Sequence, residues 1–132
     1  MISFGEDGLS GHPDHIAIGQ HALSAFYKCK YVRAFYWLAV PHSIAEAPGM
    51  AQIRATPDEH ITHTIDVSKV WESKQDAIRY HQTQLKESPI LKSDQSKQRP
   101  FLGMEHFNLI ENRPGGSSQH VISSDLLARL AE

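Results

Sequence analysis

The feature that most constrains the fold is a glycine-punctuated loop close to the first residue. Gly5, Gly8 and Gly11 recur at every third position, and glycine adopts backbone conformations that other residues avoid. A short alternating segment, residues 2–4, precedes the loop, and Pro13 follows it at a place that suits the first turn of a helix. The sequence therefore predicts a strand, a tight loop and a helix, in a chain that begins inside a domain.

The remaining elements are predicted from apolar periodicity and from the positions of proline and glycine. The first helix is expected over residues 13–27, and the apolar run Ala34–Val40 is typical of a strand buried on both faces of a parallel sheet. Further along, we expect an irregular stretch over 41–59, a strand over 61–67 with alternate residues on one side, and a helix over 69–85 capped by Ser68. A polar loop or lid is expected over 86–100 and a short helix or strand over 101–111. The chain is then expected to form a turn over 114–118 and a helix over 123–131. This order fits a single partial α/β domain over residues 1–132, with a mostly parallel sheet flanked by helices and without its N-terminal strands.

Composition restricts the class of protein. The chain has 132 residues and a formal net charge of −2, which gives no electrostatic reason to expect nucleic acid or an anionic membrane as a partner. No apolar run has the length of a transmembrane segment. Cys29, the single cysteine, is predicted to be a small residue at a helix end, in keeping with a cytoplasmic protein. The nine histidines stand out, because histidine is the commonest metal ligand.

Two of these histidines flank the predicted helix start. His12 and His15 are three residues apart, so both can reach one site on the same face of the helix. Asp14 is better placed to hydrogen-bond a histidine than to share its metal, and the N–H groups at the helix start favour a substrate oxygen. The pattern is typical of metal-assisted chemistry that polarises a carbonyl and activates water. The alternative is a turn around Gly11 and Pro13 whose histidines only cap the helix.

Other motifs give weaker signals. The glycine loop lacks the lysine of a Walker loop and the spacing of a dinucleotide fingerprint, so a nucleotide site is not favoured. His60 and His63 would point to opposite faces of a strand. His81 lies on the apolar stripe of the second predicted helix, with Gln84 further along the same face, and this position by itself favours a structural role.

Three segments in the same order resemble a known family. Residues 4–15, with their Gly-His-Pro-Asp-His run, resemble its second motif; residues 65–84, with a closing His-x-Thr-Gln, resemble a later helix; and residues 101–107 resemble its C-terminal segment. The family is the LmbE-like or PIG-L family of zinc-dependent de-N-acetylases, which act on N-acetylglucosamine-type sugars. The resemblance implies a Rossmann-like fold.

The resemblance also implies a role for each matching residue. His15 would be a zinc ligand, and His12 would lie beside the metal and stabilise the oxyanion formed when water attacks the amide. Asp14 would tune His12, while His81 and Gln84 would line the cleft and support substrate binding.

The chain departs from the family pattern at its start. Family members open with a His-Pro-Asp-Asp-Glu motif that supplies two further zinc ligands and the general base, whereas the only His-Pro-Asp here is residues 12–14. A catalytic zinc site uses three protein ligands and an open position. We therefore expect the C-terminal portion of a deacetylase, inactive alone, which acts on an N-acetylated amino sugar together with a complementing chain or as a homo-oligomer. The alternatives are a non-catalytic remnant or binding module, and a small protein that binds metal through His12 and His15 alone.

Overall fold

The structure, a computed structural model, describes residues 1–46, 50–85 and 95–114. The chain divides into two compact units: unit 1 comprises residues 1–64 and 106–121, and unit 2 comprises residues 65–105 and 122–132. Their positions relative to one another are not determined, so each is described by itself. The prediction of one domain over 1–132 stays a prediction. The helix predicted over 123–131, and all but the first residue of the turn predicted over 114–118, lie outside the described residues.

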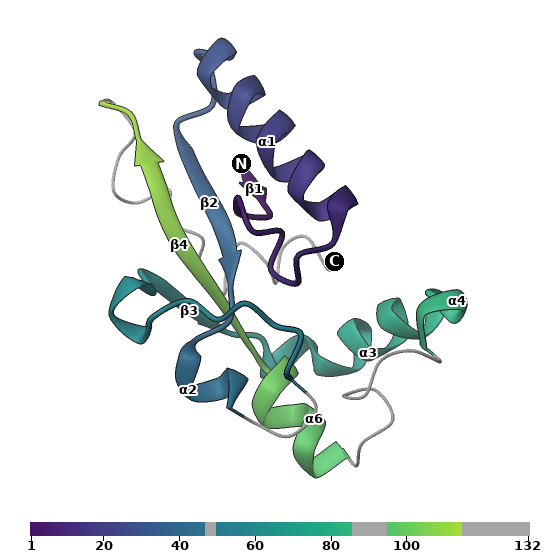
Figure 1. Cartoon of the computed structure of the whole chain (residues 1–132). Helices are drawn as coiled ribbons and strands as arrows, with labels where there is room; N and C mark the ends of the chain where they lie inside the picture. Colours follow the sequence, from purple (N-terminus) through teal and green to yellow (C-terminus); the bar gives the residue numbers. More distant parts are fainter. Residues whose placement is uncertain (47–49, 86–94, 115–132) are drawn as a thin grey trace. The chain divides into compact units, whose positions relative to one another are not determined.

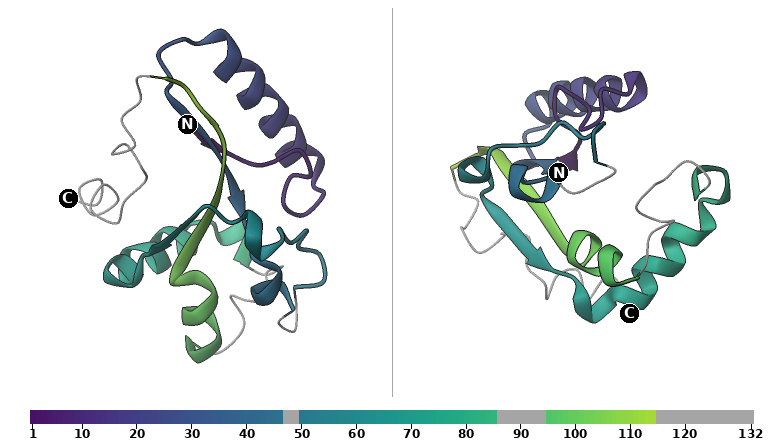
Figure 2. Two further views of the ribbon diagram at one scale, coloured as in Figure 1. Left: turned by 90° about the vertical axis from the view of Figure 1, so that its left-hand side faces the viewer. Right: turned by 60° about the horizontal axis from the view of Figure 1, so that its bottom comes forward.

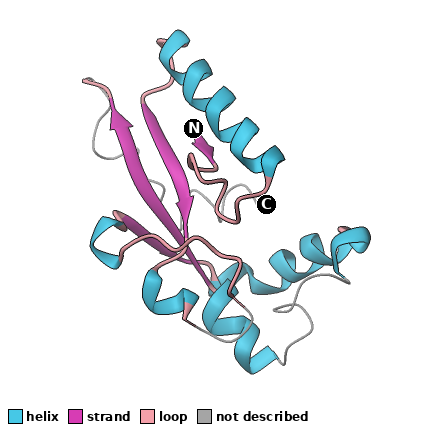
Figure 3. Cartoon of the chain, in the orientation of Figure 1, coloured by secondary structure: helices cyan, strands magenta, loops and turns pink. Residues whose placement is uncertain are grey.

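Unit 1 contains the strand–loop–helix–strand order that the sequence predicts (Figure 3). Strand β1 spans Ile2–Ser3, helix α1 spans Pro13–Lys28 and strand β2 spans Ala34–Ala39. Cys29 is the C-cap of α1, which confirms its predicted place at a helix end. None of the helices in the described ranges is long and apolar enough to cross a bilayer.

The described part of residues 41–59, which were predicted to be irregular, contains little regular secondary structure. It contains the short helix α2 (His42–Ala45) and a 3₁₀ turn at Asp58–His60. Pro41, at the end of the apolar run, forms an isolated parallel bridge with Thr56. This bridge brings the segment that follows residue 50 back toward the end of β2.

The sheet is mixed, so the predicted mostly parallel character holds only in part. The strand order is β1-β2-β4-β3, where β3 spans His63–Asp66 and β4 spans Met104–Asn112. Strand β1 pairs with β2 in parallel, as a strand–helix–strand crossover requires, but β2 pairs with β4 antiparallel. An apolar run indicates that a strand is buried and gives no information on the direction of its neighbour.

Helix α1 lies alongside β1 and β2 (Figures 1 and 2). Phe26 and Phe35 are fully buried and their rings stack with centroids 5.3 Å apart. The guanidinium of Arg113 lies 4.1 Å from the Phe26 ring and donates hydrogen bonds to the carbonyls of Phe26 and Cys29 at 2.8 and 2.7 Å. These contacts join the C-terminal end of α1 to the residue that follows β4.

Gly19 brings the middle of α1 close to the end of β1. A Cβ atom at this position would lie 2.7 Å from the carbonyl oxygen of Gly5 and 2.8 Å from that of Phe4. Only a residue without a side chain permits this approach. It fixes the distance between α1 and the loop that precedes it.

Strand β3 confirms the predicted alternation. Ile65 and Val67 are 4% and 5% exposed, whereas Thr64 and Asp66 between and beside them are exposed. One side of this short segment is therefore apolar and buried.

In unit 2 the predicted continuous helix over 69–85 is wrong. The segment consists of a 3₁₀ turn at Ser68–Val70, helix α3 at Trp71–Tyr80 and helix α4 at Gln82–Leu85. His81 interrupts it with φ −82° and ψ 53°. Side chains 79–83 are exposed, so no buried apolar face favours a continuous helix across this point.

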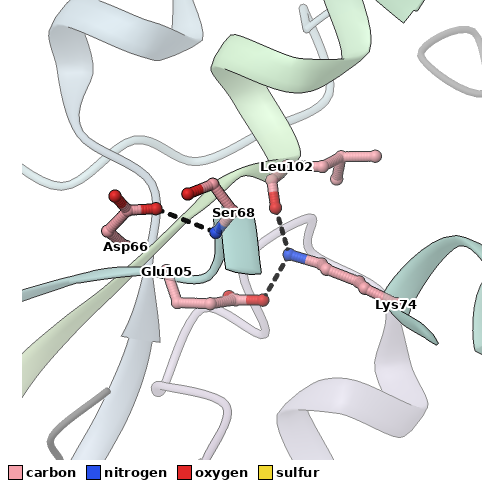
Figure 4. A network of polar contacts seen from close by, with 5 residues as sticks. All are labelled: Asp66, Ser68, Lys74, Leu102 and Glu105. Atoms are coloured by element: carbon pink, nitrogen blue, oxygen red, sulfur yellow. Dashed lines mark hydrogen bonds and ion pairs between the residues drawn. The ribbon is translucent and has the colours of Figure 1, made fainter. Parts of the chain in front are cut away.

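Two further predictions for unit 2 are corrected (Figure 4). Ser68 is not a side-chain N-cap; its N–H donates instead to Oδ1 of Asp66 at 2.8 Å. Residues 95–100, predicted to be a polar loop, belong to helix α6 (Gln95–Leu102). The ammonium of Lys74 donates to the carbonyl of Leu102, at the end of α6, and to Oε1 of Glu105. Contacts distant in sequence stabilise α6, and its polar sequence carries no helical periodicity to reveal it.

Candidate functional site

The loop between β1 and α1 is held by its own hydrogen bonds. Gly8 N–H donates to the carbonyl of Gly5, and Gly11 N–H to that of Asp7, both at 3.0 Å. Asp7 Oδ1 also accepts from Leu9 N–H at 2.8 Å. Gly8, Leu9 and Gly11 have φ values of 65°, 64° and 75°. A left-handed conformation costs a non-glycine residue roughly 1–2 kcal/mol, so the surrounding structure imposes the shape of the loop at Leu9.

His15 lies in the first turn of α1 with its ring orientation fixed on two sides. The ring stacks on Phe4, with centroids 4.0 Å apart and planes 5° from parallel. Its Nδ1 lies 3.1 Å from the carbonyl oxygen of Gly8. Because a carbonyl oxygen only accepts, Nδ1 carries the proton, and Nε2 of the neutral ring carries the lone pair. A metal-ligating histidine has this tautomer, with its second nitrogen bonded to a backbone carbonyl.

His12 has the opposite tautomer. It is the N-cap of α1, and its Nδ1 accepts a hydrogen bond from Asp14 N–H at 3.2 Å. The proton of the neutral ring is therefore on Nε2, which makes this nitrogen a donor. The His12 side chain is 57% exposed, so the donor is accessible to a ligand.

The structure brings together the three site residues that were predicted at the helix start. The rings of His12 and His15 have centroids 5.1 Å apart and are tilted by 41°. Asp14 hydrogen-bonds His12 through its backbone N–H, whereas its carboxylate Oδ2 lies 3.9 Å from Nδ1 and is 83% exposed. A contact at this exposure contributes little to stability, and the hydrogen bond from Asp14 N–H orients the His12 ring.

The other two predicted site residues lie in unit 2. His81 is the C-cap of α3 and is exposed, which contradicts its predicted place within one continuous apolar stripe. Gln84 lies in α4. Their roles in substrate binding stay predictions.

The described residues do not form a complete zinc site. His15 can supply one ligand through Nε2, and His12 lies next to it. A catalytic zinc ion uses three protein ligands, and no group of three His, Cys, Asp or Glu side chains suited to a metal occurs within residues 1–46, 50–85 and 95–114. Any further protein ligands of a zinc ion would come from outside these described residues.

Sequence patterning missed Arg54 as a neighbour of the loop. Its backbone N–H donates to the carbonyl of Leu9 at 2.7 Å, and its guanidinium lies beside Gly11, where a Cβ would be 2.8 Å from Nη2. The residue belongs to an irregular stretch with neither periodicity nor motif. The only signal available was Gly11 itself, since glycine permits close approach by another group.

Unit 2 has an open groove of about 610 Å³ next to the polar network of Figure 4. Trp71 and Met104 give it apolar walls, and Asp66, Ser68 and Arg99 add polar groups. The pKa of Asp66 is lowered from its ordinary value of 3.8, mainly by hydrogen bonds from the hydroxyl and backbone N–H of Ser68. All residues that line the groove belong to unit 2, whereas the residues predicted at the start of α1 belong to unit 1.

No family model and no solved structure matches the chain, but curated proteins do. A 1D-myo-inositol 2-acetamido-2-deoxy-alpha-D-glucopyranoside deacetylase of Salinispora arenicola is 30% identical over 98% of this chain and 50% of its own length. Proteins of the same name from Mycobacterium sp. (strain JLS) and Mycobacteroides abscessus are 28% and 31% identical, over 97% and 87% of this chain and 48% of their own length.

The similarity therefore covers nearly all of this chain and only part of each relative. The chain spans about half the length of the curated relatives that it matches. Those relatives are named as deacetylases of an acetamido sugar, which is a hydrolase activity. This chain is thus similar in sequence to about half of a sugar de-N-acetylase.

Proposed function

We propose that this chain is part of a metal-dependent hydrolase that removes an acetyl group from the nitrogen of an amino sugar. The names of its relatives support the reaction class. The substrate class we propose is an N-acetylglucosamine conjugate. The residues that we assign to the reaction are His12, Asp14 and His15, with His81 and Gln84 in substrate binding.

The observation that carries the proposal is the pair of opposite tautomers at the start of α1. Gly8 holds the proton of His15 on Nδ1, and Asp14 N–H holds that of His12 on Nε2. One ring thus offers a lone pair and its neighbour offers an N–H donor. Amide hydrolysis needs both a site for a Lewis acid and a donor for the developing oxyanion.

His12 would act as the oxyanion donor through Nε2–H. A preorganised donor of this kind typically contributes about a hundredfold or more to kcat. Asp14 N–H donates to His12 Nδ1 and thereby fixes the ring orientation. The high exposure of both side chains leaves room for a substrate.

Zinc is the metal that we propose, with His15 as one ligand. When bound, it would polarise the acetyl carbonyl and activate water. The described residues hold no group of three metal ligands, so we propose that a complementing segment, in another chain or in a second copy, provides the other two. The general base would come from the same segment.

A second candidate function is a binding module without catalysis. The incomplete ligand set among the described residues favours it. In this case the His12–His15 pair would bind zinc weakly or not at all, and no complementing segment would change that.

Calorimetric zinc titration separates the two candidates. We expect the 132-residue chain alone to bind zinc weakly and to release no acetate from 1D-myo-inositol 2-acetamido-2-deoxyglucopyranoside. Co-expression with a segment that carries the His-Pro-Asp-Asp-Glu motif should restore tight binding and acetate release.

Variants then assign the roles. His15→Ala should abolish tight zinc binding, whereas His12→Ala should keep it and lower acetate release by about a hundredfold. His21→Ala is the matched control, because His21 is exposed on the same helix. Tight binding that survives His15→Ala would contradict the assignment, and no binding in any combination would favour the non-catalytic module.

A further inference from the structure

Arg54 is anchored beside the candidate site by its backbone. Its N–H donates to the carbonyl of Leu9 at 2.7 Å, within the loop that precedes α1. A side chain on Gly11 would meet three atoms of the guanidinium, at 2.8, 3.1 and 3.2 Å from its Cβ. The cationic group therefore lies against the residue that immediately precedes His12.

The guanidinium has no protein acceptor within the described residues. Three other arginines of the described ranges have an acceptor: Arg113 donates to main-chain carbonyls, Arg79 pairs with Asp76, and Arg33 donates to the carbonyl of Pro114. No carboxylate or carbonyl accepts from Arg54 in the ranges that the structure describes, and the residue is exposed. A guanidinium presents a planar fork of donors that matches the two oxygens of a carboxylate or phosphate.

We propose that Arg54 binds an oxyanion, a carboxylate or a phosphate, on the ligand that occupies the site at His12 and His15. The start of α1 adds potential of the same sign, while the Asp14 carboxylate opposes it. This proposal rests on the proposed function for the remainder of the ligand, and within that substrate class it predicts that acetamido sugars with an anionic group bind more tightly than neutral ones. Gly11 is then required, because a side chain there would displace the guanidinium.

The test is an NMR titration of the 132-residue chain, without metal, with inorganic phosphate and separately with acetate. We expect one of these anions to shift the backbone amide signals of Gly11 and His12. Arg54→Gln should weaken that binding about tenfold or more, because a hydrogen bond to a charged group contributes at least that much. Arg54→Lys keeps the charge, loses the fork and should give an intermediate affinity.

Arg33→Gln is the matched control, since it removes one positive charge from an exposed arginine of the same unit. The affinity of this variant for the anion should stay within about twofold of that of the unchanged chain. Whichever anion responds identifies the ligand group as phosphate or carboxylate. The proposal is overturned if neither anion shifts these signals, or if Arg54→Gln binds as tightly as the unchanged chain with a folded spectrum. Since the titration uses neither metal nor turnover, its failure is distinguishable from failure of the deacetylase proposal, which acetate release tests.

Discussion

Replacing Gly19 by alanine sets two effects of known sign against each other. In a helix interior, alanine is more favourable than glycine by about 0.8–1.0 kcal/mol. At this position, however, the new methyl group would lie 2.7 and 2.8 Å from the carbonyl oxygens of Gly5 and Phe4. Both obstacles are backbone atoms, so no side-chain rotation relieves the contact.

The steric effect should outweigh the helix propensity. Overpacking of a well-packed contact typically costs about 1–3 kcal/mol, and relief here requires α1 to move away from β1. The carbonyl of Gly5 also accepts from Gly8 N–H, so its displacement would strain the loop before His12. We place the cost near the upper end of that range, which leaves a net loss of about 1–2 kcal/mol in the free energy of unfolding.

Urea unfolding of the Gly19→Ala variant measures this loss. In a Trp71→Phe background the fluorescence of Trp37 reports on unit 1, because its indole ring lies against Gly5. Ser24→Ala, at an exposed position of the same helix, is the control for helix propensity alone and should be neutral or stabilising by up to about 0.5 kcal/mol. A Gly19→Ala variant as stable as the unchanged chain would refute the close approach of α1 to β1.

Two further predictions concern unit 2. Lys74→Met should lower the free energy of unfolding of unit 2 by about 1–2 kcal/mol, because the half-buried carboxylate of Glu105 loses its partner. The control Arg79→Met removes an exposed pair and should cost about 0.5 kcal/mol or less. Equal effects of the two variants in chemical denaturation would contradict this prediction. The pKa of Asp66 is depressed by Ser68, so its stabilising contribution is present above its unfolded-state pKa and is lost as the pH falls through the folded-state pKa. Ser68→Ala should raise the pKa of Asp66 toward its ordinary value, and an unchanged carboxyl titration by NMR would contradict the assigned cause.

The candidate site could be predicted from sequence as far as its contacts are local. Pro13 and the glycines before it predict where α1 begins, and three-residue spacing brings His12 and His15 together. The pairing of Asp14 with His12 is likewise local. Capping and turn bonds connect residues only a few positions apart, so the order of residue types is enough to specify them.

What the sequence by itself determined is the β1–loop–α1–β2 order and the proximity of His12, Asp14 and His15. Only the tertiary structure decided the antiparallel pairing of β2 with β4, the formation of α6 and the place of Arg54 beside Gly11. These features depend on partners far away in the chain, and local periodicity gives no information on which distant segment supplies them. The break at His81 has the same origin, because a helix persists through a polar stretch only where tertiary packing stabilises it.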